Sequence, residues 1–143
     1  MIDRRSRRSS ARVDVSPFYQ RILDFLILCT GHPRFFLGSD SAPHLVTSKS
    51  TATPAQSCAA GVYTSPVLLP LVAHLLESFG ALDKLQSFVS DNGRAFYQEP
   101  TPSGEVVRLR RLNCQVEETL SLGTDDVVPF WAGRDLQFSL ISS

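Results

Sequence analysis

Apolar and polar positions in the first quarter of the chain predict a helix followed by a short strand. Ser16-Pro17 is typical of a helix start, because serine can cap the helix and proline fits its first turn. Apolar residues then recur every three or four positions as far as residue 30, where Gly31 predicts the helix end. The apolar run 34–37 predicts a buried strand. This helix–loop–strand order is typical of an α/β fold. The expected apolar helix face comprises Phe18, Ile22, Phe25, Leu26 and Cys29.

A long polar loop and two helices are expected next. Residues 41–60 are rich in serine, threonine and proline, and a loop of that length is usually functional or disordered. Apolar spacing predicts a helix over 66–79, ended by Gly80, and a shorter helix over 82–89. Ser90-Asp91-Asn92-Gly93 predicts a turn, because Asn-Gly readily takes positive φ.

The last third of the chain has a different pattern. Pro100, Pro102 and Gly104 indicate a linker, and alternation of apolar and polar residues over 106–110 and 136–140 predicts two half-exposed strands. We therefore expect three segments: a tail over 1–15, a helix–strand–helix part over 16–98, and a β extension over 99–143.

Length and charge limit the classes of protein that this chain can represent. A chain of 143 residues is about one ordinary domain. Its formal net charge is zero, which gives no reason to expect a nucleic acid or a membrane surface as partner. No apolar run approaches the roughly 18 residues that a membrane span requires. The sequence thus indicates a soluble globular protein.

The first twelve residues carry five arginines against one aspartate. Such a segment can be a targeting peptide, a basic contact arm or a disordered, solvated tail. The segment has no amphipathic pattern and no apolar core before a cleavage site, which favours the disordered tail. The arginines are Arg4, Arg5, Arg7, Arg8 and Arg12.

Three cysteines, Cys29, Cys58 and Cys114, lie far apart in the sequence. None has the Cys–x–x–Cys or Cys/His spacing of a structural zinc site. They are best explained as reduced thiols, which predicts a cytoplasmic protein.

The stretch FFLGSDSAPH at residues 35–44 carries the clearest chemistry. In a parallel β/α barrel, residues at the carboxyl end of a strand point into the active site. An aspartate at such a position can bind a metal ion and accept a proton. Three more motifs follow in order: CAAGVY at 58–63, ALDKL at 81–85 and NGRAFY at 92–97. Together they resemble the C-terminal portion of a dihydroorotase, a member of the amidohydrolase superfamily, over residues 31–141.

The resemblance implies an α/β fold made of the last βα units of a TIM-type metal-dependent hydrolase barrel, with a small C-terminal β extension. A complete barrel needs about 250 residues, so this chain can supply only part of one. The implied reaction is the interconversion of N-carbamoyl-L-aspartate and L-dihydroorotate in pyrimidine biosynthesis. The implied cofactor is zinc, with two ions in a complete site. The expected partner is this small-molecule substrate, and homo-oligomer formation stays open.

The resemblance also assigns roles to four residues. Asp40 corresponds to the metal ligand that is also the general acid and base; by itself, an aspartate after a strand is often only a helix cap or turn residue. His44 corresponds to the residue that holds the substrate carboxylate; by itself, a loop histidine more often bonds to backbone. Ala42 and Ala60 correspond to small residues that line the ring pocket, although alanine is common in any core. Gly61 is expected to permit close packing or an unusual φ.

Other ligands of the family's metal site are not recognisable. The chain has no His–x–His pair, and the remaining histidines, His32 and His74, are expected to be structural. Lys49 and Lys84 are expected in a loop and a helix rather than at strand ends. Two hypotheses follow: a dihydroorotase-like hydrolase, or a catalytically inactive fragment or paralogue that at most binds another protein. On its own, the chain is expected to be inactive.

Overall fold

The computed structural model describes residues 30–49, 59–100 and 106–141. The helix expected over 16–30, the basic tail over 1–15, Cys29, Cys58 and the middle of the 41–60 loop lie outside these residues, apart from Thr30 at the helix end. The expected division into three segments stays a prediction.

The helix expected over 66–79 is confirmed as a short 3₁₀ turn, η1 (Ser65–Val67), that continues into α3 (Leu68–Ser78). Apolar residues occupy most of α3, and those buried are Pro70, Val72, Ala73 and Leu76. Gly80 follows with a φ of 68°, the left-handed conformation that glycine adopts without steric cost at a helix end.

The chain after α3 is helical for longer than expected. It forms η2 (Leu82–Lys84), a π-helical turn η3 (Ser87–Asp91) and α4 (Asn92–Tyr97). The turn predicted at Asn92-Gly93 is wrong, because both residues lie in α4. The Asn92 side chain donates a hydrogen bond to the Phe35 carbonyl at 2.9 Å, and Gly93 lies against the Phe36 ring. The two residues are therefore helical and contact a distant segment, although the local sequence prefers a turn.

The strand expected over 34–37 is also wrong. These residues are non-helical but belong to no strand, and Phe35 is exposed. The Leu37 amide donates to the Phe88 carbonyl at 2.9 Å, so η3 rather than a strand is its backbone partner. A strand exists only where a second strand completes its ladder, and the described residues place none beside this segment.

Within the residues that the structure describes, four strands form two small antiparallel sheets. β1 (Arg108–Gln115) pairs with β4 (Asp135–Ile141), with an irregularity between Arg111 and Cys114. β2 (Leu120–Leu122) and β3 (Asp125–Val127) form a hairpin. The two half-exposed strands predicted in this part of the chain are thus confirmed within β1 and β4, with shifted boundaries.

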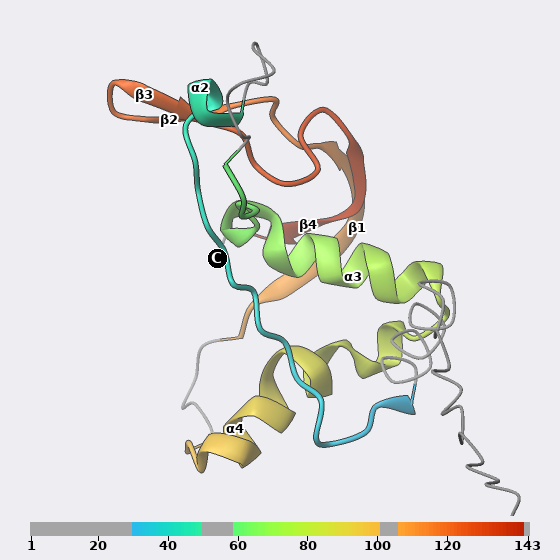
Figure 1. Ribbon diagram of the computed structural model, residues 1–143. Coiled ribbons are helices and arrows are strands. Elements are labelled where there is room, and N and C mark those ends of the chain that lie inside the picture. The colour runs from blue at the N-terminus through green and yellow to red at the C-terminus, as the bar shows by residue number, and fades with distance from the viewer. Residues whose placement is uncertain (1–29, 50–58, 101–105, 142–143) are drawn as a thin grey trace, which may run out of the picture.

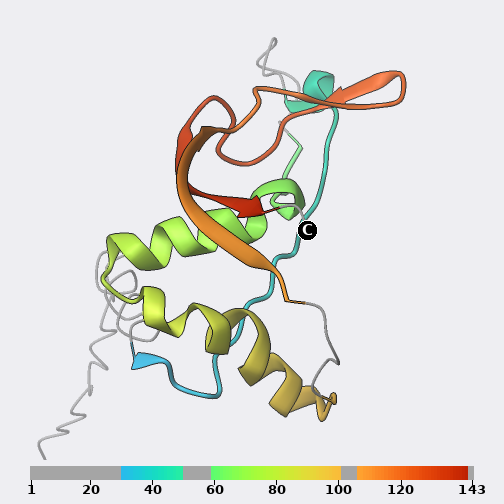
Figure 2. The same ribbon diagram turned by 180° about the vertical axis from the view of Figure 1, so that it is seen from behind.

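Helix α3 lies between the β1–β4 sheet and the helical segment that follows it (Figures 1 and 2). On one side it packs against β4, whose Leu136 and Phe138 are buried. On the other side Val72 and Leu76 join Ala81 in a cluster that also contains Leu37 and Phe88. The extended segment before α2 is therefore held to the molecule through α3 and η3.

The described residues mix helices with strands, as the expected α/β class requires, but they show no parallel sheet. Parallel pairing among them is limited to two isolated bridges, Ser41 with Val62 and Tyr63 with Pro129. Both bridges lie at the candidate site.

Candidate functional site

Backbone pairing brings residues 41–45 beside residues 59–64. Besides the Ser41–Val62 bridge, the Ala42 amide donates to the Val62 carbonyl at 3.0 Å. The Ser41 hydroxyl accepts hydrogen bonds from the amides of Thr64 at 3.0 Å and Ser65 at 2.9 Å. Two stretches about twenty residues apart are thus fixed against each other at the start of η1.

Gly61 is the closest point of this contact. Its φ is 101°, and a Cβ at this position would come within 2.9 Å of both the Ala42 Cβ and the His44 Nε2. No side chain fits there without displacing one of them, so both the expected close packing and the expected unusual φ are confirmed. The contact places Ala42 and His44, two positions that were expected to bind substrate, against the residue that follows the third such position, Ala60.

These three residues differ in exposure. Ala42 and His44 are half-buried, and Ala60 is exposed. The arrangement places an imidazole beside small side chains. Whether these residues bind substrate stays a prediction.

Asp40 lies at the edge of this arrangement. It is exposed, and its φ of 41° is an uncommon conformation for a residue other than glycine, one that aspartate tolerates better than most. It was expected at the carboxyl end of a parallel strand, but it follows an unpaired segment. Asp40 does not line the cavity described below, and its role in an active site stays a prediction.

Lys49 is a structural residue of the site that the sequence did not reveal. It ends the short helix α2 (Val46–Lys49), and its ammonium donates to the carbonyls of Ala59 at 2.8 Å and Gly61 at 2.5 Å. It therefore joins α2 to the segment that carries Ala60 and Gly61. A lysine in a polar loop carries no sequence signal for such a contact.

Residues 61–63 also line a cavity of about 400 Å³. Its lining includes Lys49, Gly61, Tyr63, Trp131 and Arg134. The Phe130 amide donates to the Tyr63 carbonyl at 2.7 Å, which fastens the segment before β4 to the site. The Arg134 guanidinium stacks 5.0 Å from the Trp131 ring centre, so this wall is both aromatic and cationic.

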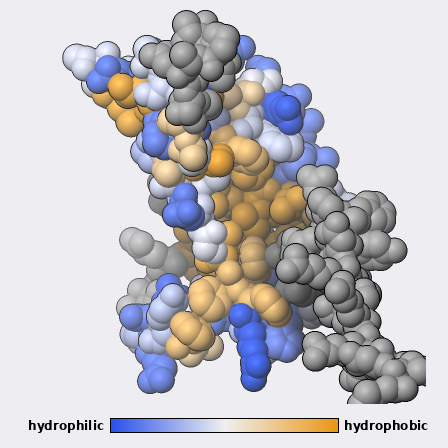
Figure 3. Space-filling view, in the orientation of Figure 1, coloured by the Kyte–Doolittle hydropathy of each residue, from blue (hydrophilic) through white to orange (hydrophobic). Residues whose placement is uncertain are grey.

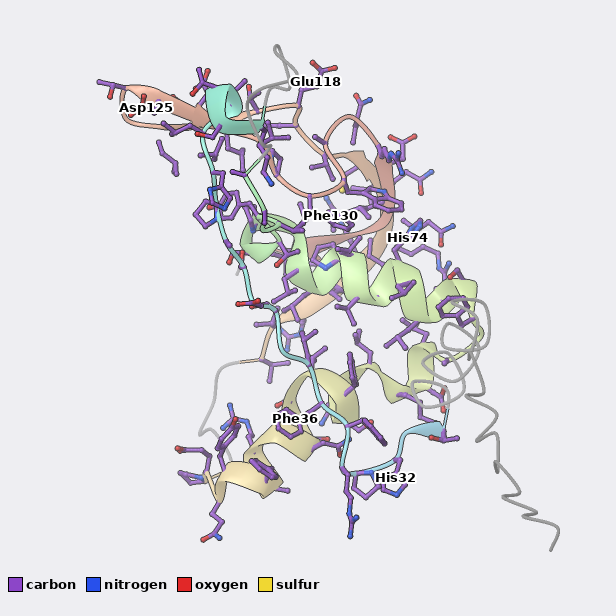
Figure 4. The ribbon with its side chains drawn as sticks, in the orientation of Figure 1. His32, Phe36, His74, Glu118, Asp125 and Phe130 are labelled. Carbon is purple, nitrogen blue, oxygen red and sulfur yellow. The ribbon has the colours of Figure 1, made fainter. Side chains whose placement is uncertain are left out.

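The two other histidines make backbone hydrogen bonds. His32 Nδ1 accepts from the Arg34 amide at 3.2 Å, and His74 Nδ1 accepts from the Gln137 amide at 3.3 Å. Figure 4 shows them far apart, His74 on α3 and His32 at the opposite end of the described segment 30–49 from α2. These bonds agree with the structural role expected for both histidines, which stays a prediction.

Residues 30–49, 59–100 and 106–141 include no group of three or more His, Cys, Asp or Glu side chains that could hold a metal ion. Cys114, the one cysteine among them, is a free, half-buried thiol. Within the same ranges, no helix has the length and apolar character needed to span a membrane.

Comparisons of the sequence and of the structure with known proteins point to the same family. No family model matches the chain. It is 43% identical over 111 residues to a dihydroorotase of Idiomarina loihiensis, an alignment that covers 78% of this chain and 31% of the relative. It is 34% identical to a dihydroorotase of Mycosarcoma maydis, over 82% of this chain and 41% of the relative.

Two solved structures show the same relationship. The dihydroorotase of Saccharomyces cerevisiae, solved with 5-fluoroorotic acid, matches 88% of this chain with a TM-score of 0.74 and 34% identity. The dihydroorotase of Campylobacter jejuni matches 89% with a TM-score of 0.72 and 30% identity. This chain covers 35% of each solved chain, and between 31% and 41% of the two curated relatives. By sequence and by backbone arrangement, the chain is therefore related to the dihydroorotases and corresponds to a C-terminal portion of them.

Proposed function

We propose that this chain supplies part of a dihydroorotase-type active site, in which N-carbamoyl-L-aspartate and L-dihydroorotate are interconverted in the cytoplasm as a step of pyrimidine biosynthesis. The chain spans about a third of the relatives that it matches, so the complete reaction needs residues from outside the described segments.

The observation that carries this proposal is the close approach at Gly61. Ala42 and His44 were assigned to substrate from sequence resemblance alone, and both lie against the residue that follows Ala60. A common substrate pocket requires such an approach of the segment 42–44 to the segment that carries Ala60, and this supports the proposal.

Each residue has a role that its chemistry suits. The His44 imidazole donates a hydrogen bond to the substrate carboxylate, which is a strong type of bond because the acceptor is charged. Ala42 and Ala60 leave room for the flat ring to lie close to the backbone. The Asp40 carboxylate accepts a proton from the attacking water and returns it to the leaving ring nitrogen.

Zinc is the cofactor that the family implies, and Asp40 is the residue that this chain would offer to it. The described residues bring no second and third ligand near Asp40. They do not by themselves fit a zinc site, so we assign no step of the reaction to the metal.

The alternative is a remnant without catalytic function. The likeness to dihydroorotases in both sequence and backbone arrangement favours the enzyme-family function. The retained Ser-Asp-Ser-Ala-Pro-His stretch agrees with this preference.

A hybrid enzyme tests the proposal. Residues 31–141 replace the matched 111 residues of the Idiomarina loihiensis dihydroorotase, and the rate of dihydroorotate hydrolysis is measured. We expect a folded hybrid with measurable activity that Asp40→Asn abolishes. A folded hybrid that binds zinc but has no activity would contradict the proposal.

A further inference from the structure

The cavity of about 400 Å³ that shares Gly61 with the candidate site has no role in the proposed function. The residues assigned to that function, Asp40, Ala42, His44 and Ala60, do not line it. Ligand pockets in proteins have volumes of roughly 300–1,000 Å³, with mostly apolar or aromatic walls and a few placed polar groups. The cavity therefore has the size of a small-molecule site, and its lining indicates the class of molecule.

Aromatic side chains form one part of the lining, namely those of Tyr63, Phe130 and Trp131. The ring centres of Phe130 and Trp131 lie 5.7 Å apart. Rings placed in this way accept another flat ring in offset or edge-to-face contact. Unlike the broad apolar area across the middle of Figure 3, the cavity also has charge in its walls. It therefore suits a ring that carries a polar group rather than a purely apolar surface.

The charge in the lining is entirely positive. Lys49 and Arg134 line the cavity, and its lining contains no aspartate or glutamate. The Arg134 guanidinium lies 5.0 Å from the centre of the Trp131 ring, and it forms no ion pair with the residues that the structure describes. A guanidinium stacked on a ring keeps the N–H groups along its edge, and these bind two oxygens of a carboxylate or phosphate. The lining therefore favours an anionic group.

The aromatic and cationic wall is held in a strained backbone conformation. Trp131 has a φ of 71°, which is uncommon for a bulky residue and persists only where the surroundings hold it. The Trp131 indole N–H donates to the Asp135 carbonyl at 3.2 Å, and the Arg134 amide donates to the Trp131 carbonyl at 3.0 Å. The Val116 amide donates to the Arg134 carbonyl at 2.9 Å, which fastens the same turn to the segment after β1. The wall is thus formed before any ligand binds.

We propose that this cavity binds a small molecule in which a flat aromatic ring carries an anionic group. The ring lies against Phe130 and Trp131, and the anionic group bonds to the Arg134 guanidinium. A carboxylate and a phosphate share the chemistry that the guanidinium recognises, and the probes below distinguish them. The site is separate from the one in the proposed function and does not depend on it.

The fluorescence of Trp131, the single tryptophan, tests the binding in the full chain. Benzoate is the probe, because it joins a flat ring to a carboxylate, and phenyl phosphate is the phosphate equivalent. We expect a saturable change with half-saturation at about 1 mM or below for at least one of them. Benzyl alcohol has the ring without the charge, and acetate has the charge without the ring. Each should need at least about tenfold higher concentration.

Substitutions of Arg134 place the anionic group. Arg134→Gln removes the charge and should raise the half-saturating benzoate concentration by at least about tenfold, because a bond to a charged group is lost. Arg134→Lys keeps the charge without the planar group and should lose less. Arg108→Gln is the matched control, because Arg108 is an exposed arginine of β1 outside the cavity lining, and it should leave binding unchanged. Circular dichroism shows whether each variant retains the fold.

Several results would overturn the proposal. One is a change that does not saturate and matches the collisional quenching of free N-acetyltryptophanamide. Benzyl alcohol that binds as well as both anions would show an apolar pocket without anion recognition, a result that needs no variant. Equal weakening by Arg134→Gln and Arg108→Gln would reduce the effect to net charge. Displacement of benzoate by a lower concentration of L-dihydroorotate would assign the cavity to the substrate of the proposed function instead of a separate ligand.

Discussion

At the scale of single residues, the site depends on the absence of one side chain. Gly61 combines a positive φ with contacts to Ala42 and His44 that leave no room for a Cβ. The sequence motif alone pointed to a special role for this glycine, because few other residues combine such a backbone with so close an approach.

Gly61→Val should therefore destabilise the chain by about 2 kcal/mol or more, through both backbone strain and the displaced neighbours. Gly123→Val is the control, because Gly123 has a similar φ of 74° but open space around it. Urea unfolding followed by the fluorescence of Trp131, the single tryptophan, measures both. Equal losses in the two variants would show that only the backbone conformation matters at position 61.

His44→Ala should lower kcat/KM of the hybrid enzyme by about 10- to 100-fold, because a hydrogen bond to a charged group contributes about 1.5–3 kcal/mol. The loss should appear mainly in KM, since the bond holds a carboxylate that does not react. His32→Ala, which removes a histidine that bonds only to a nearby backbone amide, should change kcat/KM less than about threefold. Similar losses in both variants would contradict a role for His44 in holding substrate.

At the scale of elements, α2 is joined to the 59–61 segment by the Lys49 side chain and by a backbone hydrogen bond from the Ala59 amide to the Ser48 carbonyl at 3.0 Å. The Lys49 ammonium bonds to two carbonyls of this segment, while the rest of α2 contributes no buried residue. Such a contact between distant segments arises only when the chain is folded, and for this reason the local sequence gave no sign of it.

Lys49→Met keeps most of the side-chain volume but removes these bonds, so the amides of residues 59–62 should exchange hydrogen faster. Lys84→Met is the control. Lys84 pairs with its exposed neighbour Asp83 and lowers the pKa of that carboxyl, but a solvated pair of this kind stabilises little. Unchanged exchange at 59–62 in the Lys49 variant would show that backbone pairing alone holds the segment.

At the scale of the whole molecule, helix α3 packs against other elements on two sides, while several large apolar side chains elsewhere in the described residues are exposed. Val72 and Leu76 reach one cluster, and the opposite side of α3 packs on β4. Phe35, Leu45 and Val62 are 40% to 44% exposed, and Phe96 and Tyr97 of α4 are about two thirds exposed. Exposed apolar area on this scale is typical of an interaction surface or of a protein that associates.

The isolated chain should therefore bind a dye for exposed apolar surface, such as ANS, and should associate as its concentration rises. Fluorescence titration and light scattering measure the two effects. A dilute monomer with a sharp thermal transition and no dye binding would show that the chain closes a core of its own.

The sequence by itself determined the elements whose contacts are mainly local or whose pattern of apolar and polar residues is strong. The helix ending in α3, the strands within β1 and β4, the special role of Gly61 and the family likeness all follow from residue type and spacing, because helical and strand periodicities record which face is buried. Only the tertiary structure decided whether Arg34 to Leu37 forms a strand, whether Asn92-Gly93 turns, and what Lys49 contacts. A strand needs a neighbouring strand, and among the described residues the Leu37 amide bonds to η3 instead. Asn92 lies in a helix and donates a hydrogen bond to the carbonyl of Phe35, a residue 57 positions away that no local pattern could identify.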